Sequence, residues 1–302
     1  MKKDFLEITD LTKEEIFRLF DLARYYRSRK REQKCADILA NRMLGLVFRK
    51  PSTRTRVSFE VAVHQLGGHS LYLAGESTQI SRGESVKDTA SVLSRYLDGL
   101  VIRTFGHDEI TEYAKHATVP VINALTDQAH PCQALADYFT VYDRRGTLDG
   151  VKVVYIGHAN NVCNSLLLGA AVLGVKIGVV APPGFGPSAD VVRKMSRPEL
   201  LTTGDDPVAF VRDADVIYTD TWVSMGEERE REQRMKTFSP YQVNAELLGR
   251  AKPSAIFMHC LPAHRGAEVT DDVLDGPQSV VMDQAENRLH CQTALLHWLF
   301  GG

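Results

Sequence analysis

Short apolar runs rich in β-branched and aromatic residues alternate with helical patterns along most of the 302-residue chain. The runs are LGLVF, SLYLA, GLVIRT and VPVINAL, followed by VKVVYIG, VKIGVVA, ADVIYTD, SAIFMHC and SVVMD. Strands that alternate with helices form parallel sheets covered by helices on both faces. The chain is therefore predicted to be an α/β protein with two sheets, four strands before the segment DRRGTLDG and five after it.

The segment DRRGTLDG separates two domains, which are expected to be joined through the helix that follows HPCQ. A further helix is predicted near the N-terminus, in ITDLTKEEIFRLFDLARYYRSRK. Thr9 or Thr12 is its candidate cap, and its apolar residues recur at helical spacing. These apolar positions are Ile16, Leu19, Phe20 and Ala23.

Composition narrows the class of protein. A net charge of -2 and a pI near 6.6 give no electrostatic reason to expect nucleic acid or an anionic membrane as a partner. The five cysteines are scattered without a CxxC pair, which disfavours a disulfide framework or a structural zinc site. We expect a cytoplasmic protein, because no apolar segment resembles a signal peptide or a membrane span.

Polar groups follow the ends of the predicted strands. Parallel sheets place their ligand crevice at the carboxyl ends of the strands, so these groups are expected to face one cleft between the two domains. The groups are PSTRTR, Arg103, HPCQ, HANN, DTWVSMG, HCLPAHR and QAENR.

The PSTRTR group predicts a phosphate site. Ser52 or Thr53 stands at the start of a helix whose apolar stripe is Val57, Val61, Ala62 and Leu66. The first turn of a helix offers free N–H groups and a positive dipole end, and the guanidinium groups of Arg54 and Arg56 match phosphate oxygens. The alternative is a charged helix start that pairs with acidic neighbours. The stretch lacks the glycine framework of a P-loop.

Three other motifs remain open on the residues alone. Asn160 and Asn161 in GHANN are either a carboxylate site or a helix cap, and the missing glycines disfavour a nucleotide-dependent dehydrogenase. The His and Cys residues of HPCQ and HCLPAHR match no zinc pattern, and Cys260 is either a reactive or an inert buried thiol. The run EEREREQRMK is either a solvated helix or a mobile lid.

Taken together, STRTR, HPCQ, DTWVSMG and HCLP resemble the transcarbamoylase family, from FRKPSTRTRVSFE to AENR. The resemblance implies transfer of the carbamoyl group of carbamoyl phosphate to an amine, without metal or cofactor. DxxxSMG with HCLP indicates L-ornithine as acceptor, giving citrulline and phosphate in arginine biosynthesis. It implies a carbamoyl-phosphate domain over 1–133 with a C-terminal helix over 286–302, and an ornithine domain over 134–285.

The resemblance also assigns residues. It implies that Arg103, His130, Asp220 and Cys260 are catalytic, with Thr55, Arg103 and His130 stabilising charge on the carbamoyl oxygen. The implied ornithine ligands are Asn161, Asp220, Ser224 and Met225. Those implied for carbamoyl phosphate are Ser52, Thr53, Arg54, Thr55, Gln79, Arg103, His130, Gln133, Cys260, Leu261 and Arg288. The family works as a trimer with shared sites, and Gln79, where many relatives carry His, aligns with the loop that reaches the neighbouring subunit.

Other functions stay open at this stage. A sister enzyme could act on acetylornithine, aspartate or putrescine, although acidic Asp220 opposes a dicarboxylate acceptor. A catalytically silent carbamoyl-phosphate-binding subunit is the second alternative, opposed by the complete set of ligands.

Overall fold

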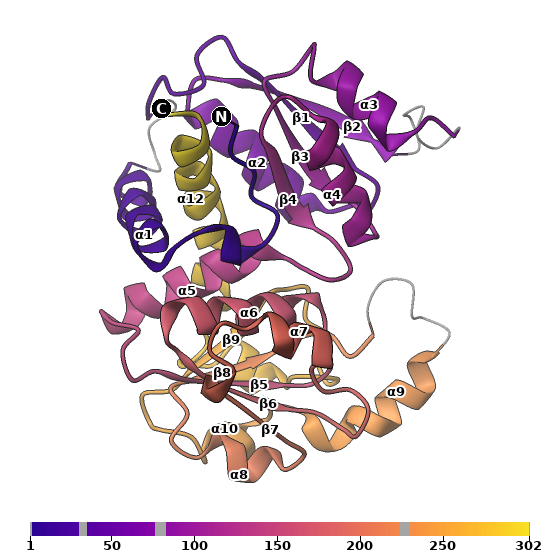
Figure 1. Cartoon of the computed structure of the whole chain (residues 1–302). Coiled ribbons are helices and arrows are strands. Elements are labelled where there is room, and N and C mark those ends of the chain that lie inside the picture. Colours follow the sequence, from indigo (N-terminus) through magenta and orange to yellow (C-terminus); the bar gives the residue numbers. More distant parts are fainter. Residues whose placement is uncertain (1, 30–34, 76–82, 224–229, 302) are drawn as a thin grey trace. The chain divides into compact units, whose positions relative to one another are not determined.

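The computed structural model of the chain describes residues 2–29, 35–75, 83–223 and 230–301 (Figure 1). Its residues form two compact units, the first Met1–Phe139 with Glu286–Gly302 and the second Thr140–Ala285. The chain passes between the units inside two helices, α5 (Pro131–Arg145) and α12 (Val281–Phe300). Among the described residues, no helix is long and apolar enough to cross a membrane.

The first unit contains a four-stranded parallel sheet in the order β2-β1-β3-β4. The strands are β1 (Met43–Phe48), β2 (His69–Ala74), β3 (Gly99–Arg103) and β4 (Val121–Leu125). Every residue of β3, and every residue of β1 after Met43, is buried, as expected for the inner strands of a sheet covered on both faces.

Helices cover both faces of this sheet (Figure 1). On one face, α3 (Val86–Leu93) and α4 (His107–His116) contribute Ala90, Ile110 and Tyr113 to a core cluster that includes strand residues. The other face carries α1 (Lys13–Ser28), α2 (Thr53–Gln65) and the last turns of α12 (Figure 1). Thr12 caps α1 in a capping box, and the four apolar positions expected on α1 are all buried, so that prediction is confirmed.

The second unit contains a five-stranded parallel sheet in the order β7-β6-β5-β8-β9. The strands are β5 (Lys152–Ile156), β6 (Lys176–Val180), β7 (Leu201–Gly204), β8 (Val216–Thr219) and β9 (Ile256–His259). Central strands β5 and β8 are almost entirely buried, whereas edge strand β7 exposes Thr202 and Thr203.

The second sheet also has helices on both faces (Figure 1). One face carries α6 (Asn161–Leu173) and α7 (Ala189–Lys194). The other carries α8 (Pro207–Val211), α10 (Ala245–Leu248) and α11 (Asp271–Leu274), whose apolar side chains share one core cluster with β5, β8 and β9. The predicted α/β class with two helix-flanked parallel sheets is confirmed.

One predicted strand of the second sheet is absent and one observed strand was not predicted, so the number of five strands still agrees. SVVMD is not a strand: Ser279 makes an isolated bridge to Phe257, and α12 begins at Val281. QAENR therefore lies on a helix and not behind a strand. In its place β7 completes the sheet, from a segment in which only Leu201 is a large apolar residue.

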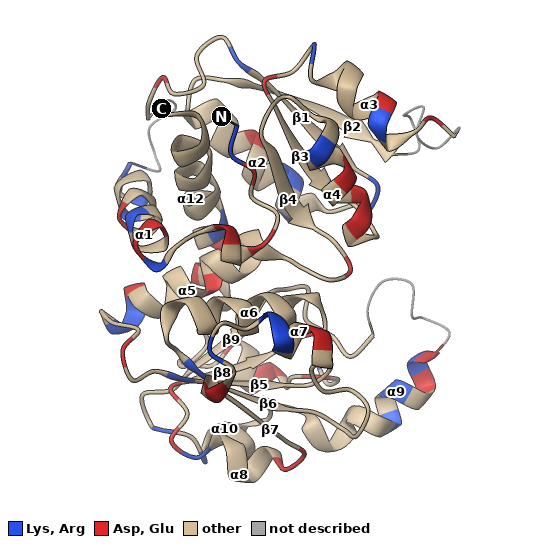
Figure 2. Cartoon of the chain, in the orientation of Figure 1, with Lys and Arg blue, Asp and Glu red and all other residues tan. Residues whose placement is uncertain are grey.

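One side of α2 also differs from the prediction. Val57 is 51% exposed and does not belong to the buried stripe, whereas Phe59, Ala62 and Val63 face the core. The described part of the mixed-charge run lies on helix α9 (Arg231–Phe238), whose ribbon carries both the blue of basic and the red of acidic residues in Figure 2. Residues 224–229 at its start lie outside the described residues.

A buried carboxylate connects the amino ends of two neighbouring strands in the second sheet. Asp215 has a side chain only 1% exposed, and it lies one residue before β8. Its carboxylate accepts from the Lys152 N–H at 2.9 Å and contacts Lys252 Nζ at 2.9 Å and Arg145 Nη2 at 2.7 Å. Burial alone raises the pKa of Asp215, but the Lys152 N–H and the two cations outweigh burial and lower that pKa.

We expect Asp215→Asn to destabilise the protein by about 3 kcal/mol, since the change removes the buried charge that pairs with the partly exposed cations of Arg145 and Lys252. Because the folded pKa is lowered, the ionised carboxylate stabilises the protein fully above its unfolded pKa, near about 3.9, and this contribution is lost as pH falls through the folded value. Denaturant unfolding of wild type and variant should therefore converge in acid. Asp190→Asn is the matched control: its ion pair with Arg193 is 79% and 72% exposed, and its loss should cost less than about 1 kcal/mol. Equal effects of the two changes would contradict this account.

Candidate active site

Each sheet has a point where its strand order reverses. In the first unit β1 is followed by β2 on one side, and the chain then returns to place β3 on the other side. In the second unit β6 and β7 extend from one side of β5, and β8 and β9 from the other. The loops leaving the carboxyl ends of the two strands at such a point diverge and leave room for a ligand. The first point lies between β1 and β3, and the second between β5 and β8.

At the first point, the helix start predicted from PSTRTR is present. Ser52 caps α2, and its hydroxyl accepts from the Thr55 N–H at 3.3 Å and donates to Thr55 Oγ1 at 3.1 Å. Arg288, on α12, donates from Nη2 to the same Thr55 oxygen at 2.8 Å. Thr53 and Arg54 are exposed beside this buried threonine. The arrangement presents helix N–H groups, hydroxyls and a guanidinium to an anion.

His130 lies among cations on the same unit. It directly precedes α5, and only 5% of it is exposed. Burial, followed by the charges of Arg288, Arg103 and Arg54, holds its pKa well below the ordinary histidine value. The imidazole is therefore neutral at neutral pH. It can donate a hydrogen bond from its N–H group, but it is not an imidazolium that could act as a general acid.

Gln133 adds an acceptor to this group. It lies in the first turn of α5, 1% exposed, and its Nε2 donates to Asp137 at 2.8 Å. Its Oε1 is buried without a hydrogen-bond partner in the described part of the chain. A buried acceptor of this kind is costly unless a ligand N–H completes it.

At the second point, a carboxylate replaces the cations. Asp220 follows β8 and is 5% exposed. One carboxylate oxygen accepts from Asn160 Nδ2 at 2.6 Å, and the other accepts from the Thr221 N–H at 2.8 Å and from Cys260 Sγ at 3.0 Å. All three donors are neutral groups, so the negative charge of Asp220 is oriented by them but not cancelled. This part of the site suits a cationic or amine ligand.

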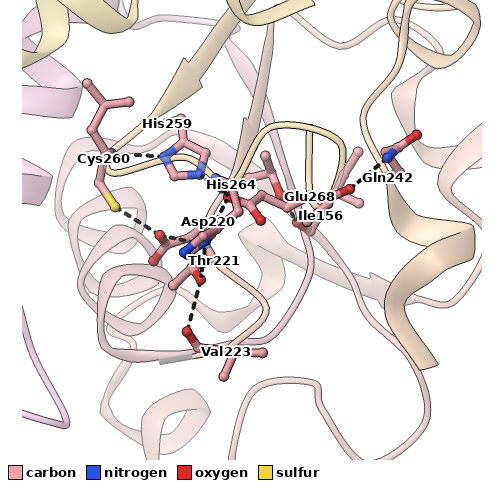
Figure 3. Close-up of polar contacts among 12 residues, drawn as sticks. Ile156, Asp220, Thr221, Val223, Gln242, His259, Cys260, His264 and Glu268 are labelled. Atoms are coloured by element: carbon pink, nitrogen blue, oxygen red, sulfur yellow. Dashed lines mark hydrogen bonds and ion pairs between the residues drawn. The ribbon is translucent and has the colours of Figure 1, made fainter. Parts of the chain in front are cut away.

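The turn that carries Cys260 is held from behind by two buried residues (Figure 3). The Leu261 N–H donates to His259 Nδ1 at 2.9 Å, so the ring hydrogen lies on Nε2, which contacts Glu268 Oε1 at 3.2 Å. Glu268 also accepts from the His264 N–H at 2.6 Å. Burial raises the pKa of Glu268, but the hydrogen bonds from His259 and His264 outweigh it, and the pKa is lowered. Leu261 has φ of +57°, an unfavourable value for leucine that these bonds maintain.

Asp220, His259 and Cys260 are the one group of described residues whose ligand atoms could hold a metal ion, within 4.8 Å of one another. Both nitrogens of His259 are already engaged, by Leu261 and by Glu268. Metal binding there would have to break the contacts that shape the turn.

The structure brings most of the expected residues together in two sets. Ser52, Thr55 and Arg288 are hydrogen-bonded, and Arg103 and Arg54 lie close enough to His130 to lower its pKa. Asp220 and Cys260 are in contact, with Leu261 next along the chain. Gln79, Ser224 and Met225 lie outside the described residues.

Sequence reasoning missed the contact of Asn160 with Asp220 and the role of Glu268. Asn160 is the cap of α6, accepting from Val162 and Cys163, and it is also the residue that holds Asp220, whereas Asn161 is the first residue of the helix. The cap alternative for this pair is confirmed at Asn160, and the binding of a ligand carboxylate stays a prediction. Glu268 gave no sequence signal, because its partners become neighbours only in the fold.

Two family models match consecutive parts of the chain. "Aspartate/ornithine carbamoyltransferase, carbamoyl-P binding domain" matches residues 3–143, and "Aspartate/ornithine carbamoyltransferase, Asp/Orn binding domain" matches residues 149–299. The chain belongs to the aspartate/ornithine carbamoyltransferase family. Within this family the carbamoyl-P match includes Ser52, Thr55 and His130, and the Asp/Orn match includes Asp220 and Cys260.

Family members of known name are similar over the whole chain. "Ornithine carbamoyltransferase, anabolic" of Pyrococcus furiosus is 50% identical, the alignment covering 99% of this chain and 97% of that protein. The ornithine carbamoyltransferase of Methanosarcina acetivorans is also 50% identical, over 98% of each chain. The solved structure of the Pyrococcus furiosus ornithine carbamoyltransferase matches with a TM-score of 0.95, covering 100% of this chain and 98% of that one.

This carbamoyltransferase should expose one reactive thiol per chain. All five cysteines are described, and Cys260 is partly exposed while the others are buried. Burial raises the pKa of Cys132 to about 12 and also raises the pKa of Cys163 and Cys291, which suppresses their thiolates.

We expect Ellman's reagent to modify one thiol in the native protein and all five after denaturation. Cys260→Ser should abolish the native reaction, whereas Cys163→Ser, a change at a buried thiol of the same unit, should leave it in place. A native count of two or more, or a reaction that survives Cys260→Ser, would contradict the burial pattern.

Proposed function

We propose that this chain transfers the carbamoyl group of carbamoyl phosphate to the side-chain amine of L-ornithine, giving L-citrulline and phosphate. The observation that carries the acceptor is the buried carboxylate of Asp220, which accepts from Asn160, Thr221 and Cys260 and from no cationic side chain of the described residues. Its charge attracts an amino acid with an additional amine and repels one with a second carboxylate, which opposes aspartate. The names of the relatives agree with ornithine.

In this proposal the first unit binds carbamoyl phosphate. Ser52, Thr53, Arg54 and Thr55 hold the phosphate at the start of α2, where free N–H groups and the helix dipole favour an anion. Arg288, through its bond to Thr55, adds positive charge at the same place. The domain expected over 1–133 and 286–302 corresponds to this role.

The carbamoyl group lies among neutral and cationic donors. Thr55, Arg103 and His130 donate to the carbamoyl oxygen, whose charge grows as the tetrahedral intermediate forms. A neutral His130 suits this task, because it stabilises the oxygen without protonating it. Gln133 Oε1, a buried acceptor, takes a hydrogen bond from the carbamoyl NH₂. Cys260 and Leu261 complete the contacts with this group.

The second unit binds the acceptor in its neutral-amine form. Asn161 and Asp220, together with Ser224 and Met225 of the segment outside the described residues, bind the α-carboxylate and α-amino group. Asp220 and Cys260 orient the side-chain amine, which must lose a proton before attack. The amine nitrogen forms a bond to the carbamoyl carbon, the carbon–oxygen bond to phosphate breaks, and the leaving phosphate takes the electron pair and a proton from nitrogen. Unchanged turnover and an unchanged pH profile in Cys260→Ala would contradict this role of the thiol.

We also propose a cytoplasmic homotrimer that works in the biosynthetic direction, as the word "anabolic" in the Pyrococcus furiosus name suggests. Val57 on α2 and Leu71 on the neighbouring edge strand β2 are 51% and 48% exposed, and exposed apolar side chains on adjacent elements favour association. Gln79, expected to reach a neighbouring site, lies outside the described residues. Light scattering should give three times the 33.6 kDa of one chain, and the mass of a single chain would contradict the trimer.

The decisive experiment offers ornithine, acetylornithine, aspartate and putrescine separately with carbamoyl phosphate. We expect product from ornithine alone, because of the four compounds only ornithine has an α-carboxylate, a free α-amino group and a free side-chain amine together. Product from another amine would keep the carbamoyl-phosphate site and overturn the acceptor. No product from any of them would favour a silent binding subunit.

Two isosteric variants separate the substrates in the same assay. Asp220→Asn should lower kcat/KM for ornithine by about 100-fold through lost charge, with KM for carbamoyl phosphate little changed. Thr55→Val should lower kcat/KM for carbamoyl phosphate by about 100-fold through a lost donor. The reverse pattern would contradict the division of roles.

A further inference from the structure

Arg234 is a buried cation on an otherwise solvated helix. On α9 its neighbours Arg231, Glu232 and Gln233 are exposed, as the mixed-charge sequence predicts, but Arg234 is only 7% exposed. An arginine keeps its charge at any physiological pH, so burying it is unfavourable unless its donors find partners. The contacts of this side chain therefore indicate what its burial achieves.

The guanidinium of Arg234 contacts three separate segments of the second unit. Its Nη1 donates to the Trp222 carbonyl at 3.3 Å and lies 3.2 Å from His158 Nδ1. Its plane packs on the Phe185 ring, with 5.4 Å from the guanidinium carbon to the ring centroid. Glu230, 62% exposed, accepts from Nε at 3.0 Å. Nη1 therefore remains available for the Trp222 and His158 segments.

Aromatic rings enclose this guanidinium and fix its place. Phe185 and Phe238 meet edge to face at 4.8 Å, and Trp222 stacks on Phe238 at 5.9 Å. His158 meets Phe185 edge to face at 5.5 Å. Phe238 is one turn after Arg234, so the buried side of α9 consists of a cation and an aromatic ring set into this cluster.

Two of these contacts lie directly behind the acceptor-binding carboxylate. Trp222 is two residues after Asp220, and His158 is two residues before Asn160, whose amide donates to Asp220 at 2.6 Å. Tyr155 continues the support, donating to the His158 carbonyl at 3.0 Å and contacting Asn160 Oδ1 at 3.2 Å. A single guanidinium thus spans the two loops that hold the Asn160–Asp220 contact.

We infer that Arg234 is a positioning residue that sets the affinity of the site for the amino-acid acceptor. It does so by fixing Trp222 against His158, which keeps Asp220 and Asn160 at hydrogen-bonding distance. The inference rests on the proposed function for the identity of the acceptor, but the positioning of Asp220 is testable without it. Lysine cannot replace Arg234 fully, because an ammonium lacks the planar fork that reaches two loops and stacks on a ring.

The test compares Arg234→Met, Arg234→Lys and the control Arg231→Met, an exposed arginine on the same helix. We expect Arg234→Met to raise KM for ornithine so that kcat/KM for ornithine falls by about 10- to 100-fold, as for other residues that orient a ligand-binding group. KM for carbamoyl phosphate should stay within about twofold of wild type, a split that general loss of folding would not produce. Arg234→Lys should lie in between, and Arg231→Met should match wild type.

A second measurement follows Asp220 without any substrate. Cys260 Sγ contacts Asp220 at 3.0 Å, so displacement of the carboxylate should free the thiol. We expect Ellman's reagent to modify Cys260 several-fold faster in Arg234→Met than in Arg231→Met, with both variants still melting cooperatively.

The two measurements fail in different ways. If wild type makes citrulline but Arg234→Met behaves like Arg231→Met in both assays, the positioning role is overturned. Equal losses for both substrates would also overturn it. If wild type turns over no acceptor, the proposed function fails, and the rate of Cys260 modification still decides whether Arg234 holds Asp220.

Discussion

The site depends on the reversal of strand order in each parallel sheet. Where the strand order reverses, the loops that follow two adjacent strands lead to opposite sides of the sheet. No connecting segment then covers the carboxyl ends of these two strands. In the first unit this places the start of α2 beside Arg103, and in the second it places the start of α6 beside Asp220. Backbone N–H groups and charged side chains thereby reach a ligand from rigid elements, whereas a mobile loop would have to order them first.

The two sets of side chains are electrostatically opposite, and this difference accounts for their division of work. Around His130 the charges are guanidinium groups, which together with the larger effect of burial lower its pKa, and which favour an anionic ligand. Around Asp220 the donors are an amide, a backbone N–H and a thiol, which orient the carboxylate and leave its charge to attract a cation. A net charge of -2 for the chain conceals this separation, so composition alone could exclude partners but could not locate binding sites.

Much of the fold could be predicted because the inner strands are buried on both faces and read as continuous apolar runs. The errors fall where that signal weakens. Strand β7 lies at the sheet edge and needs few apolar residues, whereas in SVVMD only Val280 and Val281 are buried and the last three residues begin α12. Short apolar runs do not distinguish a strand from a buried helical turn. Val57 was misplaced for a related reason, since helical spacing does not say which apolar face meets the sheet.

Some residues of the candidate site could be predicted from the sequence and others could not. Residues such as Arg54 and Asp220 could be found because they follow strand ends in polar motifs that a ligand would explain. Glu268 and Arg234 could not, since each acts on residues distant in sequence. Glu268 is a single acidic residue in its segment, and Arg234 is one charge among many in a mixed-charge run.

These two buried ions lie behind the residues that would touch the acceptor, one under the turn of Cys260 and one beside Trp222. The turn contains Leu261 at φ of +57°, a conformation that persists only where the surrounding bonds impose it. A well-packed apolar side chain would contribute as much or more to stability than a buried charge at such a position. Directional hydrogen bonds instead hold a strained turn and the Asp220 carboxylate in one geometry, so these two buried charges contribute chiefly to the precision of the site.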